Sequence, residues 1–280
     1  MSARASMVRL AHAGAVTTLT LARPAKRNAL VPDLLLDLCV ALEQIGRRSE
    51  TRAVVFAAEG VSFSIGGDIG RIASDKHGAA LQTYAAELVG LLNQAIVSLL
   101  CLPQPVVAAV HGDVGGGSLG FLLASDLVVM ADDAVAEANY AGDGVTPDGG
   151  WTALLPRLIG ARRAAACLLL GGPMTARQAF DWGLVNVLVE RGQVGAEAHA
   201  AAERIAAAPP VTMQTSKRLL AQELAQVEAA LEAERRSFVA AVGRPRQDGP
   251  APGLVAGPVV RSAERPSGGF GRAAAATRET

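Results

Sequence analysis

The chain has 280 residues, half of them hydrophobic, and its formal net charge is zero because 26 basic residues balance 26 acidic ones. This length supports one large hydrophobic core or two modest ones. The balanced charge argues against nucleic acid as a partner, because phosphate backbones require a basic excess. The three cysteines (Cys39, Cys101 and Cys167) lack metal-ligand spacing, so we expect buried thiols in a reducing compartment and no metal site.

The N-terminal segment predicts neither a targeting signal nor a membrane anchor. Its sequence, MSARASMVRLAHAGAVTTLTLARP, carries early arginines but no unbroken apolar stretch, and a signal peptide needs one. We identify no run that approaches the ~20 apolar residues of a membrane span. We therefore expect a cytoplasmic protein without a membrane partner.

Alternating strands and helices are predicted along most of the chain. Residues 8–11 and 15–22 alternate in polarity and predict a hairpin. The further predicted elements are a helix at 32–45, a strand at 53–58, a long helix at 79–101, a strand at 105–110, a short helix ending near Ser125, and strands at 127–131 and 184–190. This order indicates an α/β protein with glycine-rich connections.

The C-terminal third is predicted to be helical and then to lose its regular pattern. Thr175 and Gln178 form a capping box for a helix that ends before Gly183, and three alanine-rich helical patterns run from about 193 to 241. From residue 243 the chain is rich in Gly, Pro, Ala and Arg without periodicity, which is typical of a disordered tail. We thus divide the chain into a core (1–192), a helical region (193–242) and a tail (243–280).

The loop HGDVGGGSLG, residues 111–120, fits two side-chain motifs only poorly. Gly115, Gly117 and Gly120 match the dinucleotide fingerprint, but four residues separate the strand from the first glycine and too few remain for the crossover helix. Gly116, Ser118 and Gly120 match the nucleophile elbow of serine hydrolases, which needs a histidine later in the chain. His199 lies in a predicted helix and His111 precedes the serine, so neither suits that role.

The third interpretation assigns the chemistry of this loop to its backbone. A second loop, FSIGGDIG at 63–70, also follows a strand and presents adjacent glycines. Glycine permits unusual dihedrals and close approach, so two such turns can aim two N–H groups at one oxygen. Each donor of such an oxyanion hole contributes ~2.7–4 kcal/mol to transition-state stabilisation.

Five motifs occur in the order LARPAKRNAL, FSIGGDI, PVVAAVHGDVGGGSLGFLLASDLVVMAD, GVTPDGGWTALLPRLIG and MTARQAFDWGLVNVLVE. Over about residues 8–240 the chain therefore resembles the enoyl-CoA hydratase/isomerase (crotonase) superfamily. The resemblance implies an α/β, ClpP-like spiral of β-β-α units with a C-terminal helical region that builds homotrimers, often paired as hexamers. It also implies an acyl-CoA substrate whose thioester enolate is held by two peptide N–H groups, with coenzyme A as thioester carrier and no other cofactor.

The resemblance assigns Gly67 and Gly116 as the two oxyanion donors, and Ser118 as a bystander. The segment with Lys26, Arg27 and Ala29 resembles the part near the CoA phosphates, although a solvated charged turn explains Lys26 and Arg27 equally well. The remaining implied binding residues belong to the adenine-side loop, in which Asp68 resembles a structural aspartate: Ser64, Ile65, Gly66, Asp68 and Ile69.

Both glutamates of a typical hydratase are absent. Their positions hold Leu119 and Tyr140, and leucine can neither orient nor deprotonate water. We therefore expect an isomerase rather than a hydratase, with Tyr140 lining the acyl pocket.

Asp148 is the acidic residue that survives, in TPDGG. It resembles the carboxylate with which isomerases move an α-proton of a 3-enoyl thioester to the γ-carbon, and the aspartate nucleophile of aromatic-acyl-CoA dehalogenases. Two alternatives stay open: an enzyme that uses Asp148 in a hydratase-like, dehalogenase or thioester hydrolase reaction, in the last two as nucleophile, and a non-catalytic acyl-CoA-binding homologue. In the latter, Asp148 only caps the following helix, which would lower its pKa, whereas burial would raise it.

Asp143 and the tail add two further expectations. Asp143 either pairs with Asp148 for a 3,5-to-2,4 dienoyl shift or is a surface turn residue between two glycines. After Phe238 the chain lacks the lysine-rich end that closes on CoA in this family, and Arg244 and Arg246 are the basic residues that could replace it.

Overall fold

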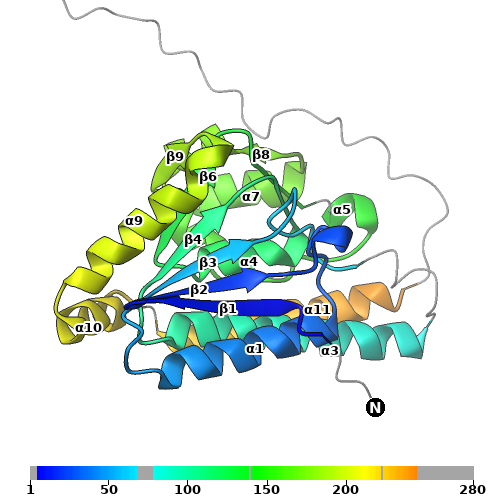
Figure 1. Ribbon diagram of the computed structural model, residues 1–280. Coiled ribbons are helices and arrows are strands. Elements are labelled where there is room, and N and C mark those ends of the chain that lie inside the picture. Colours follow the sequence, from blue (N-terminus) through cyan, green and yellow to red (C-terminus); the bar gives the residue numbers. More distant parts are fainter. Residues whose placement is uncertain (1–4, 69–77, 139, 222, 245–280) are drawn as a thin grey trace, which may run out of the picture.

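A six-stranded sheet forms the centre of the computed structural model, which describes residues 5–68, 78–138, 140–221 and 223–244 (Figure 1). Ile69, Arg246 and residues 245–280 of the predicted tail lie outside the described residues. The sheet has the order β1-β2-β3-β4-β6-β9. Its strands are β1 (Val8–Ala13), β2 (Val16–Leu21), β3 (Ala53–Ala58), β4 (Val106–Val110), β6 (Leu127–Ala131) and β9 (Val187–Val189).

The main sheet combines one hairpin with parallel strands. β1 and β2 are antiparallel, and β1 continues to Ala13 because His12 pairs with Thr17 and Ala13 with Val16. The other neighbouring strands are parallel. The side chains of β4 are all buried, which explains its continuous apolar sequence. The predicted strand at 184–190 shortens to β9 because Leu184 and Val185 turn into the core before it.

A smaller sheet follows the main one along the spiral and carries one of the glycine loops. It has the order β5-β7-β8, formed by β5 (Asp113–Gly115), β7 (Val135–Glu137) and β8 (Met174–Thr175). β5 follows β4 after two residues and β7 follows β6 after three, so successive turns of the chain add one strand to each sheet.

Helices cover the main sheet and complete one continuous core. α1 (Pro32–Arg47), α3 (Ala79–Cys101) and α11 (Leu224–Val242) pack together below the sheet in Figure 1. α9 (Val194–Ala207) packs on β2, β3, β4 and β6, so the core extends across the predicted boundary at 192. α10 (Pro210–Leu220) lies between α9 and α11 in the chain, which confirms the three predicted C-terminal helices.

Short elements connect these layers. They are the 3-10 turns η1 (Pro24–Lys26), η2 (Gly116–Ser118) and η3 (Arg191–Gln193), and the helices α4 (Leu119–Leu123), α5 (Tyr140–Asp143), α6 (Leu155–Ile159), α7 (Ala161–Leu170) and α8 (Ala176–Asp181). The predicted capping box of Thr175 and Gln178 is confirmed at the start of α8.

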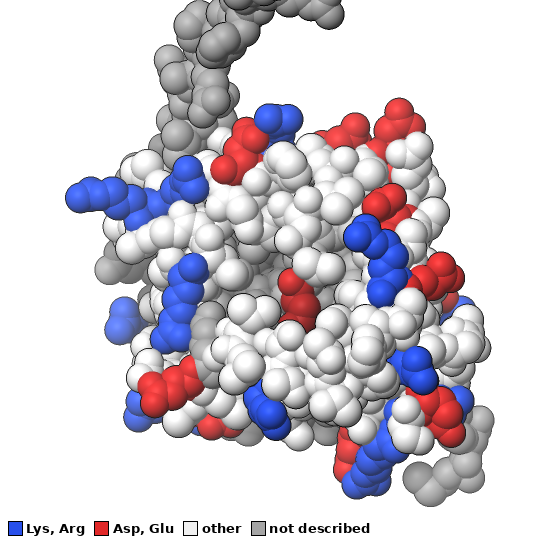
Figure 2. Space-filling view, turned by 90° about the vertical axis from the view of Figure 1, so that its left-hand side faces the viewer, with Lys and Arg blue, Asp and Glu red and all other residues white. Residues whose placement is uncertain are grey.

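The charge of the surface bears on the predicted partners. On the face shown in Figure 2, basic and acidic side chains are interspersed, as the zero net charge leads one to expect.

Among the described helices, α3 is long and apolar enough to pass as a membrane span by length and composition, which differs from the prediction made from the sequence. Half of its most apolar window is buried inside the protein.

Candidate active site

The two glycine loops meet side by side, as the oxyanion interpretation expects. Ser64 forms a parallel bridge with Val114, and the Gly115 N–H donates to the Ser64 carbonyl at 2.8 Å. Leu30 pairs with Gly67 in a second bridge, through hydrogen bonds to the Gly66 carbonyl and the Asp68 N–H. The C=O and N–H of one trans peptide group point in opposite directions. Because the Gly66 carbonyl points to Leu30, the Gly67 N–H of the same peptide group points away from Leu30.

Glycine is required where these loops touch backbone to backbone. A methyl group at Gly115 would lie 2.4 Å from the Ile65 carbonyl oxygen, and one at Gly66 would lie 2.6 Å from the Gly115 carbonyl oxygen. Gly116 has a φ of +47°, which other residues rarely adopt. The glycines therefore let the two loops approach each other and turn the chain at Gly116.

The Ser118 hydroxyl is held by two backbone carbonyls. It is fully buried, and its hydroxyl is shared between the carbonyls of Gly115, at 2.7 Å, and Ser64, at 3.0 Å. The histidines considered as its partners lie elsewhere: His111 contacts the Gly60 carbonyl, and His199 contacts Thr18. The structure therefore agrees with the backbone interpretation of this loop.

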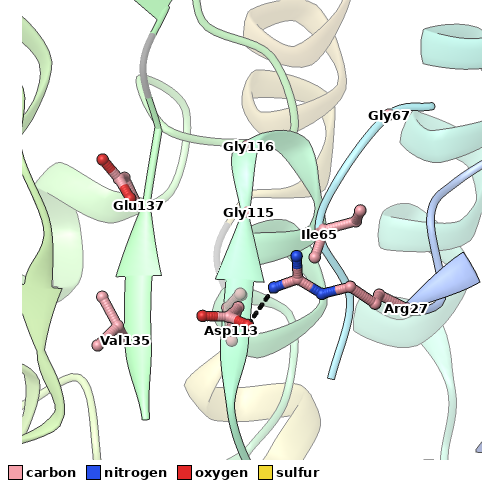
Figure 3. A pocket seen from close by; sticks show the side chains of 9 residues that line it. Arg27, Ile65, Gly67, Asp113, Gly115, Gly116, Val135 and Glu137 are labelled. Atoms are coloured by element: carbon pink, nitrogen blue, oxygen red, sulfur yellow. Dashed lines mark hydrogen bonds and ion pairs between the residues drawn. The ribbon is translucent and has the colours of Figure 1, made fainter. Parts of the chain in front are cut away.

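Gly67 and Gly116 line one cavity of about 270 Å³ (Figure 3). It lies between the FSIGG loop and the small sheet. Its lining residues are Arg27, Ile65, Gly67, Asp113, Val114, Gly115, Gly116, Val135 and Glu137. Sequence reasoning missed Asp113, Val135 and Glu137, because only the pairing of β5 with β7 brings them to the cavity.

The predicted CoA-binding residues divide into exposed and internal ones. Lys26 is exposed at the end of η1, and Arg27 is half-exposed and forms an ion pair with Asp113 across the cavity (Figure 3). Ala29 and Gly66 are buried within the loops. The Ser64 side chain is fully buried and donates to the Asn28 carbonyl at 2.8 Å, so its hydroxyl does not face a ligand. Asp68 is paired with Arg23 at 3.3 Å, in agreement with a structural role.

Asp148 lies against Gly115–Gly117, the predicted oxyanion loop. Asp148 is 7% exposed, and a methyl group at Gly117 would stand 2.9 Å from both of its carboxylate oxygens. Gly149 follows with a φ of +67° and packs on the Gly117 carbonyl. The carboxylate therefore lies next to Gly117, the residue that follows the predicted donor Gly116 in the sequence.

Tyr140 donates a 2.6 Å hydrogen bond from its hydroxyl to Oδ1 of Asp148. Burial raises the pKa of Asp148 to about 6; the hydrogen bond from Tyr140 opposes this rise, and the negative charge of Glu234 adds to it. Burial, followed by the charge of Asp148, raises the pKa of Tyr140 well above its usual value. The Tyr140 hydroxyl therefore remains a donor at neutral pH.

Trp151 supports both sides of this arrangement. Its Nε1–H donates to the Gly116 carbonyl at 2.9 Å, and its ring lies edge-on to Tyr140 with centroids 6.1 Å apart. Because Trp151 is almost fully buried, both contacts are held by the core.

The helix-cap interpretation of Asp148 is wrong. The backbone N–H groups of Gly150, Thr152 and Ala153 donate to Glu234 of α11, at 2.8, 2.7 and 3.1 Å. α6 itself begins after Leu154 without a side-chain cap. The Asp148 carboxylate thus does not cap the helix, and its pKa is raised rather than lowered.

Leu119 and Asp143 are the two remaining positions considered from the sequence. Leu119 is fully buried at the start of α4, so no carboxylate faces the cavity from this position. Asp143 is partly exposed at the end of α5, and the carboxylate that acts on Asp148 is Glu234 instead. Within the described residues, no three His, Cys, Asp or Glu side chains gather as a metal site would require.

Comparison with known proteins gives the same family at the level of sequence and fold. The enoyl-CoA hydratase/isomerase family matches residues 11–249. A 4-chlorobenzoyl coenzyme A dehalogenase from Arthrobacter sp is 30% identical over 84% of this chain and 85% of its own. The 1,2-epoxyphenylacetyl-CoA isomerase of Escherichia coli is 31% identical over 69% and 74%. A crystal structure of an enoyl-CoA hydratase/isomerase from Mycobacterium paratuberculosis superposes with a TM-score of 0.77, at 26% identity over 86% and 95%.

Proposed function

Because the chain belongs to the enoyl-CoA hydratase/isomerase family and has its α/β crotonase fold, we propose that it is an acyl-CoA isomerase that shifts a double bond in an enoyl-CoA thioester. Acyl-CoA is the substrate class, coenzyme A arrives as the thioester carrier, and no other cofactor takes part. A homotrimer or dimer of trimers in the cytoplasm belongs to the same proposal.

In the proposed reaction, the thioester oxygen lies between the N–H groups of Gly67 and Gly116. Asp148 removes a proton from the α-carbon of a 3-enoyl thioester, and the negative charge moves onto that oxygen as a dienolate. Asp148 then returns the proton to the γ-carbon, which leaves a conjugated 2-enoyl thioester. Because the same carboxylate takes and returns the proton, no water is consumed and no second acid is needed.

The observation that carries this proposal is the placement of Asp148. It is a buried carboxylate against the oxyanion loop, its pKa is raised to about 6, and it is held by a tyrosine donor. A group that must both accept and return a proton works best with a pKa near the operating pH. The buried Leu119 supports isomerisation over hydration, because no carboxylate orients water there.

A dehalogenase is the second candidate, and its support is the similarity to the Arthrobacter enzyme. Asp148 would then attack the halogen-bearing ring carbon, expel halide, and form an aryl ester that water hydrolyses. The hydrogen bond from Tyr140 lowers the pKa of Asp148 and so weakens it as a nucleophile and as a base alike; it does not separate the two candidates.

A two-substrate assay separates the candidates. The purified protein is incubated with a 3-enoyl-CoA, followed by the ultraviolet absorbance of the conjugated product, and with 4-chlorobenzoyl-CoA, followed by chloride release. We expect conjugation and no chloride. Chloride release without conjugation would replace the isomerase by the dehalogenase, and acyl-CoA binding without either product would indicate a non-catalytic homologue.

A further inference from the structure

Glu234 is a buried carboxylate on the last described helix, far in sequence from the residues that it binds. Its side chain belongs to a residue that is 5% exposed, on α11. Its oxygens accept four hydrogen bonds: from the N–H groups of Gly150, Thr152 and Ala153, at 2.8, 2.7 and 3.1 Å, and from the Thr152 hydroxyl at 2.6 Å.

These donors belong to the turn that starts two residues after Asp148. The first N–H groups of a helical segment have no partner within the helix, and a carboxylate placed there satisfies them and is favoured by the helix dipole. Here the turn at 150–154 leads into α6, and Leu154 donates to the Gly150 carbonyl. Glu234 thus supplies from another helix the cap that Asp148 would otherwise provide locally.

The Asp148 segment is therefore held from two sides. On one side, Gly149 packs against the Gly117 carbonyl, so closely that a methyl group at Gly149 would lie 2.3 Å from its oxygen. On the other side, Glu234 binds the next residues of the same segment. Movement of the turn would change the position of Asp148 relative to the oxyanion loop.

We propose that Glu234 is a positioning residue of this active site: it fixes the turn at 150–153 and so keeps the Asp148 carboxylate free and placed for proton transfer. This inference rests on the proposed function, and it gives α11 a role in the chemistry in addition to the predicted role in oligomerisation.

The charge of Glu234 acts on Asp148 as well. Among the described residues, the titratable groups that act on Asp148 are Tyr140 from α5 and Glu234 from α11. At Gly117, the nearest neighbours of an added methyl group are Leu92 of α3 and the two Asp148 carboxylate oxygens, and neither Gly117 nor Leu92 carries a charge. Removing the Glu234 charge is therefore expected to lower the pKa of Asp148, whereas removing the Tyr140 hydroxyl is expected to raise it.

The test compares three variants: Glu234→Gln, which removes the charge, Glu234→Asp, which keeps it, and Glu232→Gln as the matched control. Glu232 lies on the same helix and pairs with Arg235 at 2.6 Å, away from Asp148. For each variant kcat and KM are measured with a 3-enoyl-CoA. The Asp148 carboxyl is titrated by carbon NMR of aspartate-labelled protein, its signal identified by its loss in Asp148→Asn.

We expect Glu234→Gln to lower kcat about tenfold or more with KM within about twofold, because a small displacement of a reacting group is costly. We also expect its Asp148 titration to move to lower pH. Glu234→Asp should keep the titration near that of the wild type, and Glu232→Gln should change neither property.

A Glu234→Gln protein with a lower melting temperature but unchanged kcat and unchanged Asp148 titration would overturn the inference and leave Glu234 a structural cap. If that variant does not fold, Glu234→Asp decides: a wild-type kcat together with a titration that moves to lower pH would contradict the proposal. If the wild type converts no 3-enoyl-CoA, the proposed function fails. Separately, an Asp148 pKa that is the same in the wild type and in Glu234→Gln would overturn this inference.

Discussion

The hydroxyl of Tyr140 donates a 2.6 Å hydrogen bond to Oδ1 of Asp148, in a position where both residues are buried. The bond occupies Oδ1, and under the proposed function Oδ2 is the oxygen that accepts a proton. It also stabilises the ionised form of Asp148 against burial, which is the larger influence on its pKa. A carboxylate that is buried and still ionised at neutral pH follows from this pair.

Tyr140→Phe is expected to move the acid limb of the kcat/KM profile to higher pH. In the wild type the limb should lie near pH 6, because activity falls as Asp148 takes up a proton. Without the hydroxyl the carboxylate loses a stabilising donor, so its pKa rises and activity falls already at higher pH. The pH–rate profile of the two proteins measures this shift, and a limb that stays in place or moves to lower pH would contradict it.

Gly117→Ala is expected to displace Asp148 and lower kcat by about a hundredfold. The new methyl group would lie 2.9 Å from both Asp148 oxygens and 2.7 Å from Leu92, so a side chain must move. Gly46→Ala is the control, since the nearest contact of its methyl group is ordinary, at 3.5 Å. That change lies within α1 and should stabilise the protein by about 0.5–1 kcal/mol. Equal activities of the two variants would show that Asp148 does not need this position.

Ser118→Ala separates the structural role of this serine from that of a nucleophile. The hydroxyl joins the carbonyls of Ser64 and Gly115, so its loss should lower the free energy of unfolding by about 1 kcal/mol while most of the activity remains. Denaturant unfolding and turnover are measured on the same preparation. Complete loss of turnover in a folded protein would bring back the nucleophile elbow.

The stability of the fold should depend on pH through Asp148. Its pKa is raised from 3.8 to about 6, so the folded state binds more protons than the unfolded chain between these values, and stability falls as pH rises through them. Asp148→Asn removes this dependence. The variant should gain on the order of 3 kcal/mol relative to the wild type between pH 4 and pH 8. Urea unfolding at the two pH values tests the sign; a wild type that gains relative to Asp148→Asn at pH 8 would refute the burial argument.

Local sequence signals predicted much of the fold and the backbone part of the site. The apolar runs of β3 and β4, the helical spacing of α1 and the capping box at Thr175 all depend on residues near in sequence. Two glycine loops that each follow a strand led to the prediction of paired N–H donors, the family resemblance assigned Gly67 and Gly116, and both residues line one cavity. Ser64 and Ala29 were predicted to bind CoA, but their side chains are buried, which a motif does not reveal.

The partners of Asp148 depend on distant contacts that the sequence does not encode locally. Glu234 lies 84 residues after Gly150, in a helix whose other charged residues face solvent or pair with each other, so no spacing distinguishes it. The predicted place of Tyr140 in the acyl pocket stays a prediction, and the hydrogen bond from its hydroxyl to Asp148 was not foreseen. The alternative that Asp148 caps the following helix is wrong for the same reason, since a residue from α11 accepts those hydrogen bonds.

The most direct test of the central claim compares the initial rates of wild type and Asp148→Asn with a 3-enoyl-CoA, at pH 8 where Asp148 is ionised. Calorimetry with acyl-CoA serves as the control for binding. We predict conjugated 2-enoyl-CoA from the wild type, a rate about 10²–10⁴-fold lower in the variant, and similar acyl-CoA affinity for both proteins. Equal rates in the two proteins, or a wild type that binds 3-enoyl-CoA without converting it, would contradict the assignment of Asp148 as the base of an isomerase.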